Sequence, residues 1–233
     1  MVPSLSGFAV ISIDLGLGAM QAGRASQYAA TSRIARLLEN LQISATWNLA
    51  DPANSEVLDR IVTESAGHEI GVLGDSSWLK PHINRAQLLS ELMRRFGGAR
   101  AIRLPVSTLA LHNVTFYQNL DLLVANGIRV IRPPTSKTLG KSMPYRLQCG
   151  VWQIPATAVC PHSEIPAGAS RGTHVVVDAN AISAKDLRNT EQFLKRISKC
   201  RDRGQLRIET LSEVGERLTE QTPTGGSILR KAA

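Results

Sequence analysis

Acidic and basic side chains lie at or near the ends of several apolar runs that this sequence offers as strands. The run FAVISID ends in Asp14, HVVVDA contains Asp178 near its end, and AIRLP carries Arg103. The carboxyl ends of parallel strands meet at one edge of a sheet, so we expect these three side chains to converge there. Two carboxylates beside a guanidinium group can transfer protons, form an ion pair or bind a polar ligand.

Further polar and aromatic residues occupy similar positions. The stretch HEIGVLGDSSW, residues 68–78, is typical of a strand that runs into a polar loop, and it places Asp75 and Trp78 beyond the strand. A flat indole face can stack on a sugar ring, and Trp152 is a second candidate for this role. We therefore predict that Asp75, Trp78 and Trp152 bind substrate. The other polar residues at predicted strand ends are Asn48, Asp51, Arg132, Gln153 and Asn180.

The elements that must position these residues alternate between strand and helix patterns. Apolar residues at three-to-four spacing predict amphipathic helices, and Gly97 and Gly98 are expected to end one of them. The expected strands cover residues 8–14, 43–49, 68–73, 101–105, 128–131, 151–156 and 174–179, with a short one after 206. The expected helices cover residues 26–41, 55–67, 85–96, 115–127 and 186–204, with one more before 218, and residues 157–173 are expected to form a loop.

Seven or eight such units predict a single α/β domain over residues 1–221, followed by a flexible tail at 222–233. The parallel strands are expected to form a closed or nearly closed barrel, with an open doubly wound sheet as the alternative.

Composition places the chain among globular proteins. Of 233 residues, 43% are hydrophobic and 20% are charged, and no window approaches the roughly 18 apolar residues that a membrane span needs. The first apolar run lacks a basic leader, so we expect a buried strand and no signal peptide. Three cysteines without CxxC spacing predict free thiols and a cytoplasmic location.

The net charge of +8 raises the question of a polyanionic partner, either a nucleic acid or an acidic glycan. The basic residues are scattered along the chain, and no aromatic residues interleave with them as a stacking platform for bases would require. We expect a solvated basic surface and consider nucleic acid an unlikely partner.

The order of the motifs resembles the polysaccharide deacetylase family, the NodB-homology carbohydrate esterases. SIDLG (12–16) is similar to the family's first motif, GHEIG (67–71) to the opening of its second, and RLPVS (103–107) to its Arg-x-Pro-x-Gly motif. ISATWNL (43–49) is similar to the family's ATFFV strand, and the whole likeness spans residues 8 to 218. The resemblance implies a distorted (β/α) barrel with seven or eight parallel strands. It also implies a metal-dependent hydrolase that removes acetyl groups from glycans.

Several family site residues are replaced. The family's catalytic base falls on Asp14 and its motif arginine on Arg103, while the late catalytic histidine falls on Asp178. The metal-ligand positions fall on Leu15, Leu73 and Ser77. Leucine cannot ligate a metal and a lone serine rarely does, so we expect no metal and no other cofactor.

Without a metal, a buried Asp14 needs a partner, and we predict a direct Asp14–Arg103 salt bridge. We expect His68 to satisfy a backbone or helix-end group. No ligand spacing relates the other histidines, and we assign no site role to His82, His112, His162 and His174.

Two functional hypotheses follow. In the first, the protein is a deacetylase relative without metal-dependent activity that binds a glycan or related carbohydrate ligand, or acts in regulation with a protein partner or as a homo-oligomer. In the second, it is an active hydrolase of C–N bonds, removing N-acetyl groups with a site rebuilt from Asp14, Asp75, Asp178 and Arg103. We favour the first, because the loss of three ligands removes the metal-activated water.

Overall fold

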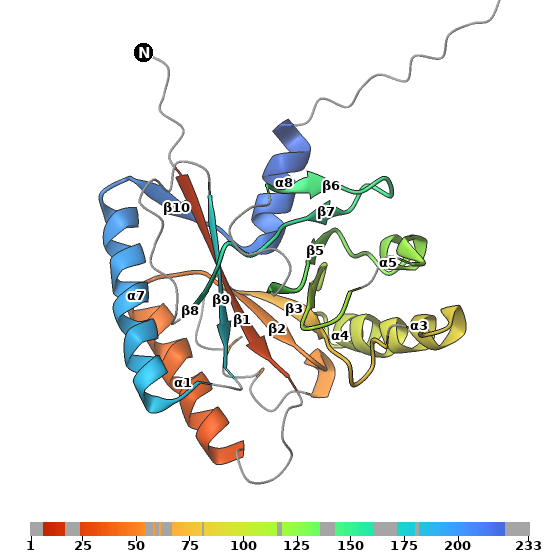
Figure 1. The fold of residues 1–233 in the computed structure, drawn as a ribbon, viewed down its shortest axis with the longest axis horizontal. Helices are drawn as coiled ribbons and strands as arrows, with labels where there is room; N and C mark the ends of the chain where they lie inside the picture. Colours follow the sequence, from red (N-terminus) through yellow and green to blue (C-terminus); the bar gives the residue numbers. More distant parts are fainter. Residues whose placement is uncertain are drawn as a thin grey trace, which may run out of the picture.

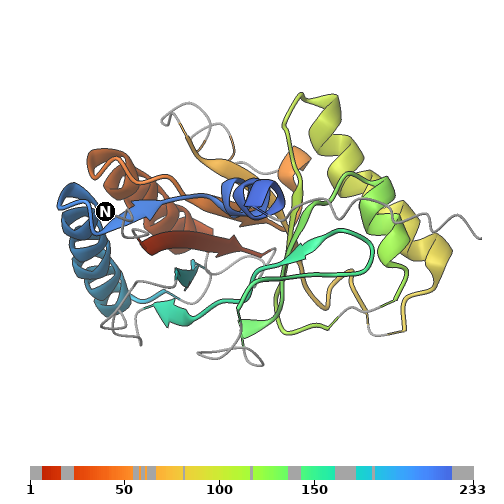
Figure 2. The same cartoon turned by 90° about the horizontal axis from the view of Figure 1, so that it is seen from above.

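One curled sheet forms the centre of the molecule in a computed structural model of the chain (Figures 1 and 2). The described residues are 7–16, 24–54, 58, 61, 67–80, 82–115, 118–135, 143–160, 172–179 and 182–221. The strand order is β6-β7-β5-β4-β3-β2-β1-β9-β8, and β10 pairs with β1 off this path. Every pairing is parallel except that of β6 with β7. The sheet forms a half-barrel with helices around it, which confirms the predicted distorted (β/α) barrel.

The elements in chain order are as follows. The strands are β1 (Gly7–Leu15), β2 (Thr46–Leu49), β3 (Glu69–Gly74), β4 (Thr108–Leu111), β5 (Val130–Arg132), β6 (Tyr145–Arg146), β7 (Trp152–Gln153), β8 (Ala158–Cys160), β9 (Thr173–Asp178) and β10 (Leu206–Ile208). The helices are α1 (Arg24–Asn40), α3 (Arg85–Leu92), α4 (Gly98–Ala101), α5 (Leu120–Ala125), α7 (Ala184–Asp202) and α8 (Leu211–Gln221). A 3-10 turn covers Pro52–Asn54, and a π-helical turn covers Met93–Gly97.

Two apolar clusters hold the sheet in place. The larger one packs the outer face of the sheet against the surrounding helices, and α1 and α7 lie side by side over it (Figure 1). The smaller one lies on the inner face of the sheet, against which α8 packs, on the side opposite α1 and α7. It consists of Val10, Val130, Trp152, Ile154, Leu211 and Val214. Burial of this apolar area is the main driving force for the fold.

Glu69 ties the last helix to the sheet. Its buried carboxylate accepts hydrogen bonds from Thr46 Oγ1 at 2.8 Å and from the Ser212 amide at 3.0 Å, and a further one from Thr108 Oγ1. Ser212 lies in the first turn of α8, whose free amides favour a negative charge. Burial raises the pKa of Glu69, and these hydrogen bonds oppose that rise. The glutamate of the GHEIG stretch therefore orients α8.

The region before β4 differs from the prediction. Gly97 and Gly98 do not end the helix, because both adopt right-handed helical angles and the chain continues through α4 to Ala101. The predicted strand over 101–105 is therefore wrong, and the strand forms later, as β4. Residues 158–160, which we expected in a loop, form β8, the outermost strand on one side of the sheet. Most of the predicted helix at 55–67, residue Asn180 and the predicted tail at 222–233 lie outside the described residues.

Helix ends elsewhere follow the sequence signals. The side chain of Asn84 accepts a hydrogen bond from the Gln87 amide and caps α3. Ser183 and Asp186 form a reciprocal capping box at the start of α7. In the part of the chain that is described, no helix is long and apolar enough to cross a membrane.

Candidate functional site

A buried ion pair lies at the carboxyl ends of β1 and β5. Arg132 Nη1 donates to Asp14 Oδ1 at 2.9 Å, and Arg132 Nη2 donates to Asp14 Oδ2 at 2.6 Å. Both side chains are only 1% exposed. Asn48 Nδ2 also donates to Asp14 Oδ1, at 2.9 Å. Two-point contact between a guanidinium group and a carboxylate is the strongest form of this interaction, so Asp14 is held rigidly.

The strand register explains this convergence. Asp14 pairs with Asn48 on β2 and with Asp178 on β9, and Arg132 pairs with Ala110 on β4. Alternate residues of a strand face the same side, so all these positions face the interior of the half-barrel. Gly71, the register partner of Asn48, leaves room for its amide, because a Cβ atom there would lie 2.6 Å from Asn48 Oδ1.

His112 stands next to this pair. It follows β4 directly, its amide donates to the Gly74 carbonyl at 2.8 Å, and its Nδ1 lies 3.9 Å from Asp14 Oδ2. Its side chain is 35% exposed, in contrast to Asp14, so it can meet a ligand from solvent. Its other ring nitrogen lies 3.1 Å from Asn113 Nδ2. We name Asp14, Asn48, His112, Arg132 and Asp178 the polar mouth.

The charges of the polar mouth shift two pKa values in opposite directions. Burial alone would raise the pKa of Asp14, but the positive charge of Arg132 and contacts from His112, Arg132 and Asn48 outweigh it and lower the pKa below its ordinary value. Interaction with Asp14 raises the pKa of His112, and the charge of Asp178 adds to this, while partial burial opposes it. Asp14 is therefore a fixed anion, and His112 is the side chain of the polar mouth whose protonated form is favoured by these charges.

The residues at the family's metal-ligand positions do not fit a metal. Leu15 belongs to the outer apolar cluster and Leu73 is 1% exposed. Ser77 donates its amide and its hydroxyl to Asp75 Oδ1 within a tight turn. Among the described residues, no three His, Cys, Asp or Glu side chains are grouped closely enough to hold a metal ion. Asp14, which we aligned with the family's catalytic base, is engaged by Arg132.

The predicted Asp14–Arg103 salt bridge is wrong. Arg103 is exposed and lies in the turn after α4, with its amide bonded to the Arg100 carbonyl. It precedes β4, whereas Asp14 is near the end of β1, so in parallel strands the two residues lie at opposite edges of the sheet. Arg132 takes the expected place. An Arg-x-Pro pattern occurs at both positions, as Arg103–Pro105 and as Arg132–Pro134, and only the second begins at the last residue of a strand.

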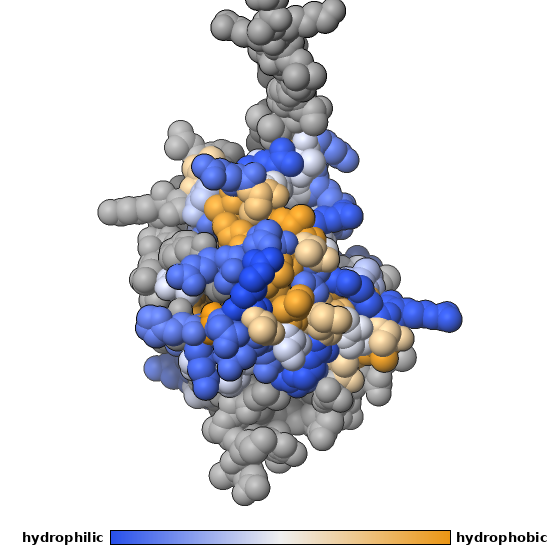
Figure 3. All heavy atoms as spheres, turned by 90° about the vertical axis from the view of Figure 1, so that its right-hand side faces the viewer, coloured by the Kyte–Doolittle hydropathy of each residue, from blue (hydrophilic) through white to orange (hydrophobic). Residues whose placement is uncertain are grey.

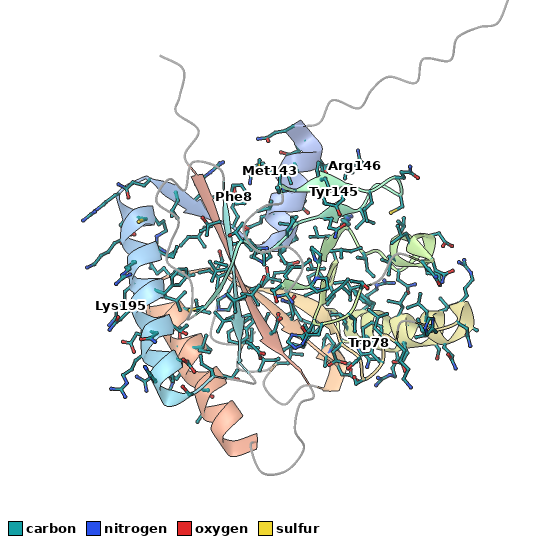
Figure 4. All side chains as sticks on the ribbon, viewed as in Figure 1. Phe8, Trp78, Met143, Tyr145, Arg146 and Lys195 are labelled. Atoms are coloured by element: carbon teal, nitrogen blue, oxygen red, sulfur yellow. The ribbon has the colours of Figure 1, made fainter. Side chains whose placement is uncertain are left out.

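The two tryptophans do not form exposed platforms at the polar mouth. Trp78 is 4% exposed, its Nε1 donates to the Leu73 carbonyl at 3.0 Å, and Arg95 stacks 4.2 Å from its ring centre (Figure 4). Trp152 starts β7, and its Nε1 donates to Thr219 Oγ1 at 2.8 Å on α8. Both act as packing residues in this structure. Asp75 is partly buried and anchors the turn after β3, at the edge where the polar mouth lies.

Trp152 lines a hollow of about 470 Å³ at the opposite, amino-terminal edge, next to a second one of about 660 Å³. The two share Ser107, Arg129, Ser212 and Glu216.

Figure 3 views the molecule from the side of α3 and α5 and shows apolar patches between hydrophilic side chains. All six exposed large hydrophobic side chains among the described residues belong to α3, α5, β6 or the residues directly next to α3, α4 or β6: Leu89, Met93, Ile102, Val124, Met143 and Tyr145.

Two other histidines have structural partners. His68 Nδ1 accepts the Ala45 amide at 3.1 Å, which confirms the expected backbone role, and burial lowers its pKa to about 4. His174 is buried between Ser12 Oγ, 2.8 Å from its Nε2, and the Pro155 carbonyl, 3.1 Å from its Nδ1. Burial, with the positive charge of Arg132, lowers the pKa of His174 to about 3, so the ring is neutral.

Sequence reasoning missed His112 because it searched for metal-ligand spacing. The signal that identifies it is positional: it is the first residue after a buried apolar strand, and the other residues of the polar mouth are the last or next-to-last residues of theirs. That strand was misplaced in the prediction, so its end was misplaced too.

The fold and the polar mouth at the carboxyl edge place the chain in the structural class of (β/α) barrels to which polysaccharide deacetylases belong. No protein-family model matches the sequence, and a search of curated proteins also gives no match. Solved structures do match, all at low sequence identity, so they establish the fold alone.

Three of the matching structures have TM-scores between 0.58 and 0.65. The chain is similar to the Puue allantoinase, with a TM-score of 0.65 and 12% identity over 96% of this chain and 93% of that one. It is similar to a probable polysaccharide deacetylase from Pseudomonas aeruginosa PAO1, with a TM-score of 0.61 and 13% identity over 94% and 93%. It is also similar to a family 4 carbohydrate esterase from Bacillus anthracis, with a TM-score of 0.58 and 15% identity over 91% of this chain and 84% of that one.

Proposed function

We propose that the protein binds a carbohydrate-related ligand at its polar mouth and does not catalyse metal-dependent deacetylation. The fold is that of carbohydrate esterases, and the polar mouth lies at the strand ends where sites of such barrels are found. His112 and Asp178 offer hydrogen-bonding groups at this edge, beside the buried Asp14–Arg132 pair. The biological role is ligand recognition, or regulation through a bound glycan.

The engagement of Asp14 is the observation that carries this proposal. In the family, the residue at this position takes a proton from a metal-bound water. Here Arg132 and Asn48 occupy its oxygens, and its lowered pKa makes it a weak base. Since Leu15 and Leu73 cannot supply ligands, no activated hydroxide is available to attack an acetyl group.

Calorimetry with N-acetylated hexosamine oligomers tests the binding. We expect saturable binding that Asp178→Asn weakens, because this side chain lies at the register position beside Asp14. Asp202→Asn is the matched control, since Asp202 is 58% exposed at the far end of α7. The proposal would be contradicted if no glycan oligomer gave a heat of binding, or if both variants lost affinity equally.

An acetate-release assay tests whether the protein lacks metal-dependent deacetylase activity. We expect no turnover of chito-oligosaccharides or peptidoglycan fragments, with or without zinc or cobalt, and no tightly bound divalent metal in the purified protein. Turnover that a chelator abolishes would show that the metal ligands are assigned incorrectly.

A second candidate is the active hydrolase with a rebuilt site, and the position of His112 favours it. A half-exposed imidazole backed by a fixed carboxylate can act as general base towards water. Arg132 and His112 would then replace Arg103 in the predicted set. Turnover that persists in chelator and disappears in His112→Gln would establish this function in place of the first.

A further inference from the structure

We propose that the solvent face of α7 is a docking surface for an acidic glycan, a polymer that carries carboxylate or sulfate groups. This surface, which we name the basic face, consists of Lys185, Arg188, Lys195, Arg196, Lys199 and Arg203, the cap residue of α7. It is distinct from the polar mouth and adds a second contact region to the proposed glycan binding.

Helical spacing puts these side chains on one stripe. Residues three, four, seven and eight apart share a face of a helix, and the six basic positions follow this pattern. The buried stripe on the opposite side contains Leu187, Leu194 and Ile197, which pack into the outer apolar cluster. All six basic residues are exposed, and Figure 4 shows Lys195 pointing outward from α7.

The acidic residues of α7 do not neutralise this stripe. Asp186 belongs to the capping box with Ser183, and Asp202 pairs with Arg201 at 2.8 Å. Glu191 bonds Lys195 at 2.9 Å, but it also bonds Arg33 on α1 at 3.3 Å, so one carboxylate serves two cations. The other exposed residues on or beside the stripe are the neutral Asn189 and Gln192 and the acidic Asp202, and Glu191 is partly exposed at its margin.

An ordinary solvated surface would carry the two signs of charge in similar numbers. On this face six basic side chains outnumber the two acidic ones, Glu191 and Asp202, whereas the whole chain holds 27 basic and 19 acidic residues. This local excess raises the positive potential and attracts polyanions. Between Lys185 and Arg203 the helix rises about 27 Å, which is long enough to contact several sugar units.

The chemistry of the stripe favours a glycan over a nucleic acid. Single-stranded nucleic acids need exposed aromatic side chains for stacking, and the one aromatic residue of α7, Phe193, is 8% exposed on the buried side. The exposed large hydrophobic side chains listed above lie elsewhere, so charge and not apolar area defines this face. The fold neighbours include esterases that act on carbohydrates.

The position of α7 relates this surface to the polar mouth. Strand β9 ends at Asp178, and α7 begins soon afterwards at Ala184 and runs back along the sheet. Lys185 and Arg188 therefore lie at the same edge as the polar mouth, while Arg203 lies at the other. A glycan chain on the basic face can approach the polar mouth with one end.

Salt-dependent binding of the full chain to fluorescent heparin fragments tests the inference. The test variant carries Arg188→Gln, Lys195→Gln and Lys199→Gln. The control variant carries Arg103→Gln, Arg129→Gln and Arg146→Gln, which are exposed on other surfaces and change the net charge equally. We expect about a tenfold or greater loss of affinity in the test variant, a slope of log affinity against log salt that is shallower by up to about three, and little change in the control.

Other outcomes overturn the proposal. Equal losses in both variants would mean that net charge alone drives binding, and duplex DNA that displaces heparin at lower concentration would assign the face to nucleic acid. Circular dichroism confirms that each variant is folded. Asp178→Asn, which tests the polar mouth, is expected to leave heparin affinity unchanged, so the two proposals can fail independently.

Discussion

Removing the charge of Arg132 is the most direct test of how the polar mouth is built. Arg132→Met keeps an unbranched side chain of similar reach but leaves Asp14 buried without its cation. Deleting one partner of a buried ion pair costs about 3 to 5 kcal/mol, because the other charge stays desolvated. For a domain of this size, that cost lowers the melting temperature by about 6 to 20 °C.

The pH dependence of this cost follows from the shifted pKa of Asp14. In the natural protein that pKa lies below 3.8, so Asp14 contributes stability that is fully present above 3.8 and is lost only as the pH falls through the lowered value. In Arg132→Met the opposing charge is gone and burial raises the pKa instead. Folded Asp14 then takes up a proton at a higher pH than unfolded Asp14 does, so the destabilisation shrinks as the pH falls.

Urea unfolding followed by tryptophan fluorescence at several pH values measures both effects. Arg103→Met is the matched control, because it is the same substitution at an exposed arginine, and we expect it to cost less than about 0.5 kcal/mol. The double variant Asp14→Leu/Arg132→Met removes both charges and should be more stable than Arg132→Met alone. A loss below about 1 kcal/mol at pH 7, a loss independent of pH, or equal losses in the two methionine variants would refute this account of the site.

Three further predictions concern the surroundings of the site. Gly71→Ala should destabilise the fold by about 1 to 3 kcal/mol in thermal melts, because its Cβ would meet Asn48 Oδ1 at 2.6 Å, whereas Gly97→Ala, with nothing within 4 Å, should be close to neutral. The natural protein should lose stability as the pH falls from 6.5 towards about 3, since unfolding lets His174 bind a proton; His174→Gln should reduce that slope by up to about 1.4 kcal/mol per pH unit in urea titrations. Trp78→Ala should cost about 3 to 5 kcal/mol, because the indole is buried; a stable variant with weakened glycan binding would restore the sugar-platform role.

The parts of the fold that the sequence predicts well are those with strong periodic patterns. The helix expected over 186–204 corresponds to Ala184–Asp202, and the strand expected over 174–179 to Thr173–Asp178. Both depend on long runs in which local preference and burial agree. Short elements such as β6 and β8 lack such runs, and whether they form is decided by their pairing with β7 and β9.

The candidate site is harder to predict, since it depends on register between strands. Asp14 and Asp178 could be placed together because each ends a clear strand. The error over Arg103 arose because two helical glycines were interpreted as a stop signal, and glycine tolerates both a helix interior and its end. Once β4 moved along the chain, His112 became a strand-end residue and Arg103 ceased to be one.

The inner face of the half-barrel shows how the charge of the buried Asp14 is compensated. A lone Asp14 at this depth would be costly, and a metal would normally compensate for its charge. Here Arg132 supplies a positive charge from the protein itself, and the neighbouring Leu15 and Leu73 are buried side chains that need no polar partner. The carboxylate of Asp14 thus acts as an anchor for Arg132. Proton exchange then falls to His112, the half-exposed side chain whose pKa is raised. Both candidate functions therefore depend on what His112 meets at the polar mouth.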